Sequence, residues 1–181
     1  MCEFTLMVLA PIFWPSDLVS GGPTRSTGAA QELPIDDLGG FLTGRWQIDR
    51  RIDHAVDGSA ARFSGVADFS PRAPGVLVYF EKGDLRIGGR VLEARRELAY
   101  RFTTFASAAV YFGDGSFFHS LDLSAGHDRV RYRCGADRYV GHFLAVSSET
   151  LRVDWHVSGP VKSYRARSLF ARLATGSEGT P

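Results

Sequence analysis

The feature that most constrains the fold is an alternation of hydrophobic and polar residues between Val110 and Leu173. Hydrophobic residues occupy every second position in successive short runs, and turn residues separate one run from the next. In one run the hydrophobic positions are Leu151, Val153, Trp155 and Val157. A period of two is typical of antiparallel strands that bury one face and expose the other. This part of the chain is therefore predicted to form antiparallel sheet.

Similar runs continue upstream to Arg45, which gives about nine or ten strands with no helical crossover between them. Gly83-Asp84 is predicted to form a hairpin turn, and the runs at 91–93 and 98–102 are predicted to be separate strands. Consecutive hairpins favour an all-β, antiparallel up-and-down barrel over a sandwich, because closure removes the edge strands. A barrel of this size has room for one small ligand.

The chain is expected to form a single domain with a flanking segment at each end. Residues 1–35 are predicted to be a loop-like extension, residues 36–174 the barrel domain, and residues 175–181 a disordered tail. A short helical turn is expected to begin at Asp36-Asp37-Leu38, because acidic residues are favourable at the positive end of a helix.

Charge and cysteine content limit the partners and the compartment. A formal net charge of +1 gives no general attraction for nucleic acid or for an anionic membrane, so neither is an expected partner. The apolar run from Phe4 to Trp14 follows no basic segment and contains proline, so it is interpreted as neither signal peptide nor membrane helix. No structural disulfide is expected between Cys2 and Cys134, which favours a cytoplasmic location.

One motif resembles the opening of a known class of barrels. Gly44-Arg45-Trp46 follows the expected helical turn and resembles the Gly-x-Trp motif in strand A of the calycins, the lipocalin-like barrels. This resemblance implies a calycin-like fold. It also implies that a basic residue of the last strand, Arg165 or Arg167 here, covers the tryptophan.

A closer resemblance, from about Leu38 to Leu173, is to a family of uncharacterised bacterial and fungal barrel proteins known as a domain of unknown function. The motifs that carry it include Leu42-x-Gly44-x-Trp46, Arg50-x-Ile52, Tyr79-x-Glu81-x-Gly83, Phe118-His119-x-Leu121-Asp122-Leu123 and Trp155-x-Val157-x-Gly159-Pro160-x-Lys162. The resemblance leads us to expect a histidine just before Cys134, where this chain has Tyr132-Arg133. It implies a fold and no activity.

The alternation also assigns side chains to the inner or outer face. Arg50 shares a face with Trp46, and His119 shares a face with Phe117 and Leu121, so Arg50 and His119 are predicted to point into the barrel. For the strand that contains Tyr79 and Glu81, two registers are about equally apolar, and one of them places both side chains inside. The predicted ligand-binding residues are Arg50, Tyr79, Glu81, Tyr111, His119, Tyr132, Trp155 and Tyr164.

These residues support three hypotheses. The first is a barrel that binds a small hydrophobic or aromatic molecule with a polar end, such as a carboxylate, carbonyl or phenol. The second is an enzyme on the same scaffold in which His119 is the catalytic acid or base for an isomerisation, cyclisation or hydrolysis. The third is a structural or interaction module with a filled core and an internal Arg50–Glu81 ion pair. We rank ligand binding first.

No cofactor is predicted, and the expected partner is a small-molecule ligand. The five histidines include no close pair, so a zinc site is not expected. A haem held by a single axial histidine, with His119 as the candidate, is left open, and so is a homodimer.

Overall fold

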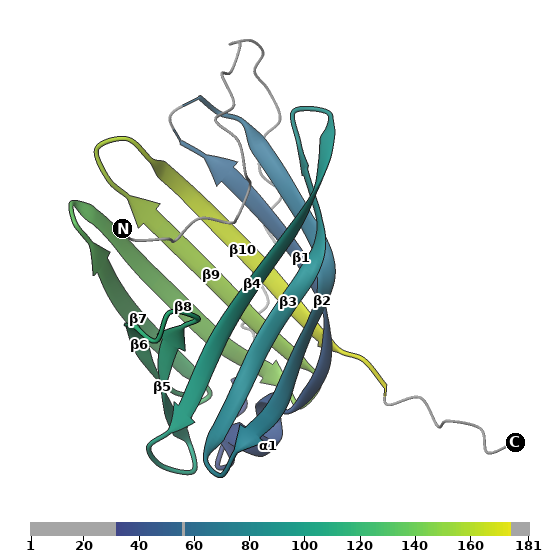
Figure 1. Ribbon diagram of the computed structural model, residues 1–181, viewed down its shortest axis with the longest axis vertical. Coiled ribbons are helices and arrows are strands. Elements are labelled where there is room, and N and C mark those ends of the chain that lie inside the picture. Colours follow the sequence, from purple (N-terminus) through teal and green to yellow (C-terminus); the bar gives the residue numbers. More distant parts are fainter. Residues whose placement is uncertain (1–31, 56, 175–181) are drawn as a thin grey trace, which may run out of the picture.

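The computed structural model describes residues 32–55 and 57–174. One short helix, α1 (Leu38–Leu42), precedes ten strands that form a single antiparallel sheet (Figure 1). The strands are β1 (Gly44–His54), β2 (Ala60–Ala73), β3 (Val76–Ile87), β4 (Arg90–Phe102), β5 (Ser107–Phe112), β6 (Phe117–Asp122), β7 (His127–Cys134), β8 (Asp137–Ser147), β9 (Thr150–Ser158) and β10 (Ser163–Arg172). The predicted all-β, up-and-down barrel with a short N-terminal helical turn is confirmed.

Pairing of the first and last strands curls the sheet into a nearly closed barrel. β1 pairs with β10 from Trp46–Arg172 to His54–Tyr164, so the sheet order runs β6-β5-β4-β3-β2-β1-β10-β9-β8-β7. The two ends of this order are β6 and β7, which follow each other in the chain. The backbone N–H of Asp122 donates to the side chain of Asp128 at 2.9 Å across this junction. The hydrophobic face of each strand therefore faces a shared interior.

Helix α1 packs across one end of the barrel and is tied to Trp46 (Figure 1). The side chain of Asp37 caps the helix by accepting from the N–H of Gly40 at 2.9 Å. The fully buried Trp46 donates its indole N–H to the carbonyl of Leu42 at 2.8 Å. The guanidinium of Arg172 lies 4.2 Å from the Trp46 ring centroid and donates to the carbonyl of Thr43, just after the helix, and to that of Phe41 within it. These contacts hold α1 across this end of the barrel.

The basic residue that covers Trp46 differs from the expected one. Arg165 and Arg167 were predicted for this role, but both are exposed, and Arg167 pairs with Asp53 on the outside of the barrel. Arg172 covers Trp46 because it is the residue of β10 directly opposite that tryptophan. The expectation of a basic last-strand residue is confirmed, and the assignment to Arg165 or Arg167 is wrong.

The predicted hairpin at Gly83-Asp84 is also wrong, because both residues lie inside the continuous strand β3. Gly83 faces Gly65 of β2, and a Cβ atom on Gly83 would lie 2.4 Å from the Cα of Gly65. Glycine at this position permits a close approach of two backbones, so it does not mark a turn. The two runs predicted at 91–93 and 98–102 likewise belong to one strand, β4.

A β-bulge changes the face assignment of β6. Phe117 was predicted inside and is 52% exposed, whereas Phe118 is buried next to His119. The register between β5 and β6 shifts between Val110 and Tyr111, so that Phe118 is the additional residue. An extra residue in one strand lets two successive side chains point inward. Strict alternation cannot predict this pair.

The cysteine prediction needs a correction as well. Cys134 is disulfide-bonded, and its partner lies outside the described residues. The expectation that no disulfide forms is therefore wrong, and the cysteine content no longer favours a cytoplasmic location. The predictions for residues 1–31 and 175–181 also lie outside the described residues. No helix in the described part of the chain is long and apolar enough to cross a membrane.

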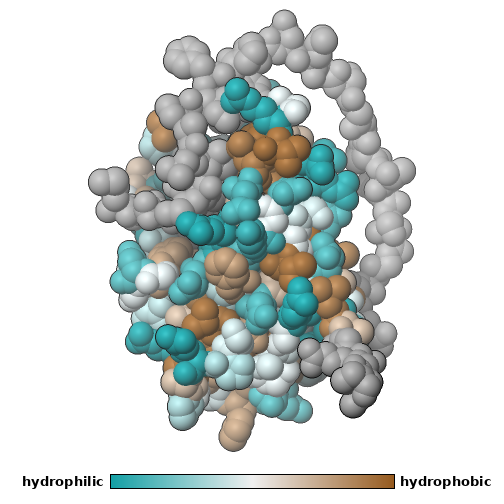
Figure 2. All heavy atoms as spheres, turned by 45° about the vertical axis from the view of Figure 1, so that its right-hand side comes forward, coloured by the Kyte–Doolittle hydropathy of each residue, from teal (hydrophilic) through white to brown (hydrophobic). Residues whose placement is uncertain are grey.

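On the face that Figure 2 shows, hydrophilic and hydrophobic side chains are interspersed. Several arginines on the outside of the barrel pair with aspartates on the same or a neighbouring strand, as Arg51 does with Asp53 at 2.7 Å. Exposed pairs of this kind contribute little to stability. Candidate binding chemistry is therefore concentrated inside the barrel.

Candidate functional site

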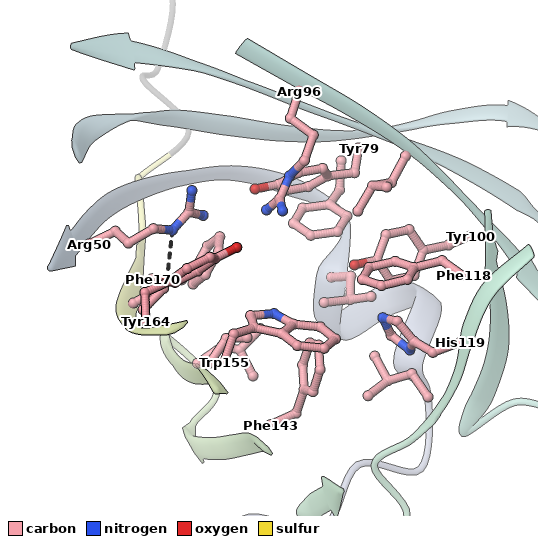
Figure 3. A pocket seen from close by; sticks show the side chains of 18 residues that line it. Arg50, Tyr79, Arg96, Tyr100, Phe118, His119, Phe143, Trp155, Tyr164 and Phe170 are labelled. Atoms are coloured by element: carbon pink, nitrogen blue, oxygen red, sulfur yellow. Dashed lines mark hydrogen bonds between the residues drawn. The ribbon is translucent and has the colours of Figure 1, made fainter. Parts of the chain in front are cut away.

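The barrel interior contains a partly open cavity of about 50 Å³ that is lined by 18 side chains (Figure 3). Most of them are aromatic or aliphatic, and a polar group lies on one side. The lining residues are Leu42, Arg50, Phe69, Tyr79, Arg96, Leu98, Tyr100, Phe118, His119, Leu121, Phe143, Leu151, Val153, Trp155, Tyr164, Ala166, Ser168 and Phe170. Space for one water requires about 10–15 Å³, so the cavity has room for a few waters or a small organic group.

An ion pair between Arg50 and Glu81 is the centre of the polar side. Two guanidinium nitrogens of Arg50 donate to the two carboxylate oxygens of Glu81 at 2.9 and 2.8 Å. The third nitrogen, Nε, donates to the hydroxyl of Ser168 at 2.9 Å, and Tyr79 donates its hydroxyl to Glu81. Both charged side chains are less than a tenth exposed. The register of β3 that places Tyr79 and Glu81 inside is the one observed.

Arg96 of β4 is a second guanidinium beside the same carboxylate, and sequence reasoning missed it. It lies directly opposite Glu81 in the sheet, and its Nη2 is 3.4 Å from a Glu81 oxygen. Its guanidinium is 5.7 Å from the centroid of the Tyr79 ring. The signal was present in the sequence, because Arg96 has the same parity as Ala94 and Leu98, but the division of β4 into two runs hid it.

The charge state of this cluster follows from burial and from the neighbouring charges. Burial would raise the pKa of Glu81, but the charges of Arg50 and Arg96 lower it to about 2. Burial disfavours both guanidinium ions, yet the charge of Glu81 raises the pKa of each. Burial raises the pKa of Tyr79 well above its ordinary value. At neutral pH the cluster therefore contains two cations and one anion.

His119 lies on the other side of the cavity and is neutral at pH 7. Burial lowers the pKa of its imidazole to about 4, and only 2% of the residue is exposed. Its Nδ1 is 3.0 Å from the carbonyl oxygen of Ser120. A carbonyl only accepts hydrogen bonds, so Nδ1 carries the proton and Nε2 is the acceptor. His119 can thus accept a hydrogen bond or a proton inside the cavity.

Trp155 forms an aromatic wall together with Phe118. Their rings are stacked at 5.3 Å between centroids with an interplanar angle of 16°. His119 and Phe143 pack against Trp155 at 5.6 and 5.9 Å. Gly141 lies opposite Trp155 in the sheet, and a Cβ atom there would come within 2.8 Å of the indole ring. The absence of a side chain at Gly141 therefore allows this orientation of the indole.

We predict that Gly141→Ala lowers the free energy of unfolding by about 1–3 kcal/mol, because the added methyl group overpacks the Trp155 wall. The tryptophan emission should shift in the same variant. The matched control is Gly113→Ala, at a position where an added Cβ has no atom within 4 Å. Denaturant unfolding and fluorescence spectra test both variants. Wild-type stability and emission in Gly141→Ala would show that the indole does not depend on this glycine.

Most, but not all, of the predicted ligand-binding residues meet at the cavity. Its lining includes Arg50, Tyr79, His119, Trp155 and Tyr164. Glu81 is not part of the lining but accepts hydrogen bonds from Arg50 and Tyr79. Tyr111 packs outside, 5.7 Å from Phe117 and 4.4 Å from the guanidinium of Arg101. Tyr132 packs against Phe118 and Tyr139 and is not part of the lining.

Sequence reasoning missed other lining residues besides Arg96. Tyr100 lies in the run predicted at 98–102, and Phe118 has the opposite parity to Phe117 and His119, so neither was proposed as a ligand-binding residue. Burial raises the pKa of the Tyr100 hydroxyl well above its ordinary value, so Tyr100 is a neutral hydrogen-bond donor. Within residues 32–55 and 57–174, no group of three or more His, Cys, Asp or Glu side chains could hold a metal ion.

Residues 42–172 match DUF6314, a family of unknown function. The chain belongs to this family. The family assignment agrees with the resemblance to an uncharacterised barrel family and adds no activity to it. A search of curated proteins found no match.

One solved structure supports the barrel fold, and designed barrels show a weaker similarity. An S-type phycobiliprotein lyase from Guillardia theta superposes with a TM-score of 0.59 at 6% identity, over 80% of this chain and 95% of the lyase. A redesigned β-barrel bound to DFHBI gives a TM-score of 0.40 at 18% identity, over 74% of this chain and 97% of the design. At such identities the similarity shows the fold alone.

Proposed function

We propose that this member of the DUF6314 family binds a small, largely aromatic molecule with a polar end inside its barrel. The observation that carries the proposal is the cavity itself, in which aromatic and aliphatic walls face a convergent group of polar side chains. Sites for small molecules generally combine a mostly apolar surface with a few polar groups that fix orientation. A filled structural core would not need charged residues on its inner face.

The size of the cavity restricts the ligand. Sites for drug-sized molecules are typically about 300–1,000 Å³, whereas this cavity is about 50 Å³. A cavity that binds benzene is about 150 Å³, so a ligand built around a single ring is the largest that the proposal allows, and lining side chains would move to admit it. A molecule as large as haem would require several walls to move. Trp155 and Phe118 offer a flat apolar surface for a ring, and the arginines lie on the opposite side (Figure 3).

A catalytic role is the second candidate, and the state of His119 is the observation that favours it. A neutral imidazole whose Nε2 is an acceptor can remove a proton from a bound molecule. Binding remains our first choice because the pKa of about 4 makes His119 a weak base.

Binding inside the barrel can be tested with a cavity-filling variant. Ala166 lines the cavity on β10, while Ala171 on the same strand is exposed. We predict that a panel of single-ring aromatic molecules contains binders that raise the melting temperature of the wild type, since a ligand specific for the folded state stabilises it. Ala166→Phe should abolish that shift, and Ala171→Phe should retain it.

Native mass spectrometry of the same samples identifies bound molecules directly, and circular dichroism confirms that each variant is folded. Equal binding by folded Ala166→Phe would place the site outside the barrel. A wild type that binds no member of the panel and retains no small molecule on purification would remove the proposal.

A further inference from the structure

The hydrogen bonds of the two inward arginines are not equivalent. Arg50 uses all three of its guanidinium nitrogens, two on Glu81 and one on Ser168. Arg96 has one contact to Glu81, at the long distance of 3.4 Å. Its Nε is buried and has no hydrogen-bond partner among the described residues. Arg96 is therefore the cation of this cluster with donors to spare.

The acceptors of Glu81 are already occupied. Each carboxylate oxygen accepts from Arg50, and the hydroxyl of Tyr79 adds a further donor on the second oxygen. None of the side chains that line the cavity is acidic. The two guanidinium groups and one carboxylate leave a single positive charge without a counter-ion in the barrel wall. The Arg96 side chain is 27% exposed, so a solute can reach this charge. An anion bound there would accept charge-assisted hydrogen bonds from the guanidinium.

Neutral hydroxyl groups surround the same space. Tyr100 and Tyr164 line the cavity and have no hydrogen-bond partner for their hydroxyls among the described residues. Figure 3 shows both side chains directed toward the middle of the cavity, with Arg96 on one side and Trp155 on the other. Burial raises the pKa of Tyr164 to about 12, so its hydroxyl stays protonated at neutral pH. Both hydroxyls are suited to donate to an anionic oxygen.

We infer that the ligand is an aromatic monocarboxylate whose carboxylate is anchored by Arg96. The inference rests on the proposed function and specifies the chemical class of its ligand. A planar carboxylate matches the fork of donors on a guanidinium. A single unbalanced charge favours a monoanion over a phosphate dianion, and a carboxylate is the smaller of the two groups. Arg96 is then the specificity-determining residue, while Arg50 and Glu81 form the support that positions it.

The test compares benzoate with benzamide, a neutral molecule of nearly the same shape, by calorimetric titration at pH 7. Wild-type protein should bind benzoate at least tenfold more tightly than benzamide. Arg96→Gln should lose this preference, because benzoate binding weakens far more than benzamide binding when the positive charge is removed. Arg96→Lys should retain a preference for benzoate, because it keeps the charge. Arg95→Gln removes a neighbouring arginine of β4 that is exposed on the outer face, and it should behave as the wild type.

The outcomes separate this inference from the proposed function. Equal affinity of the wild type for benzoate and benzamide would overturn the carboxylate assignment while leaving a barrel that binds aromatic molecules. An undiminished preference in folded Arg96→Gln would overturn the role of Arg96. Failure of the wild type to bind either molecule, together with failure of the larger panel, would remove the proposed function and the inference with it. The comparison of benzoate with benzamide in the wild type needs no variant. It therefore still tests the carboxylate assignment if Arg96→Gln fails to fold.

Discussion

Replacing Glu81 with glutamine is expected to lower the free energy of unfolding by roughly 3–5 kcal/mol, the range found when one partner of a buried ion pair is removed. Glu81 is the single carboxylate between two inward guanidinium groups and is almost fully buried. Its loss leaves Arg50 and Arg96 facing each other without an anion. Denaturant unfolding at pH 7 measures the change. The matched control is Glu97→Gln, an exposed glutamate on β4, which should change stability by less than about 0.5 kcal/mol.

The same contribution should disappear in acid. The pKa of Glu81 is lowered from 4.5 to about 2 in the folded protein. A carboxyl with a depressed folded pKa stabilises the protein above its unfolded pKa, and the stabilisation is lost as the pH falls through the folded pKa. The wild type should therefore lose the contribution of Glu81 between pH 4.5 and about 2. A Glu81→Gln variant as stable as the wild type would mean that water reaches the two arginines.

Lowering the pH from 6.5 to 4 is expected to remove about 3 kcal/mol of stability through His119 alone. The folded imidazole has its pKa lowered from 6.5 to about 4 by burial. Between these values the unfolded chain binds a proton that the folded chain does not, so the folded state loses stability as the pH falls. Below about pH 4 both states are protonated and this group adds no further change.

Two histidine variants separate this effect from general acid unfolding. His119→Gln, which does not titrate, should show a flatter dependence of unfolding free energy on pH in this window. His142→Gln, at an exposed position on β8, should keep the wild-type slope. Urea unfolding at several pH values measures the slopes, and a wild-type slope in His119→Gln would contradict the prediction. Once a ligand with measurable turnover is found, loss of turnover with retained binding in His119→Gln would support the enzyme hypothesis.

The sequence predicted the barrel because an antiparallel strand with one buried face has a simple signature. Alternation placed Arg50 and His119 inside correctly, since an inward residue shares its parity with buried neighbours such as Trp46. It failed where geometry departs from strict alternation. The bulge in β6 buries Phe118. Gly83 permits a close approach to Gly65 within a strand, so the Gly83-Asp84 pair does not form the turn that such a pair usually indicates.

The composition of the site was less predictable than the fold. Which inward residues meet depends on how the curled sheet aligns strands that are distant in sequence. Arg96 reaches Glu81 because β3 and β4 pair in one register, which no local pattern specifies. Tyr111 shows the reverse case, since it belongs to a conspicuous aromatic run yet packs on Arg101 outside the cavity. The face of the sheet on which a side chain lies could be predicted, whereas which inward side chains lie close together across the barrel could not.

The pairing of β1 with β10 also determines when the site can exist during folding. The bond between Arg50 and Ser168 joins residues separated by 118 positions, and the neighbouring strands of β1 and β10 assemble by hairpins of short range. Contacts of such long sequence separation are slow to form because a large loop must be closed first. During synthesis, nearly all of the strands must have left the ribosome before the arginines can be enclosed. A ligand that requires the complete cavity therefore binds late in folding and stabilises the barrel after the last strand has docked.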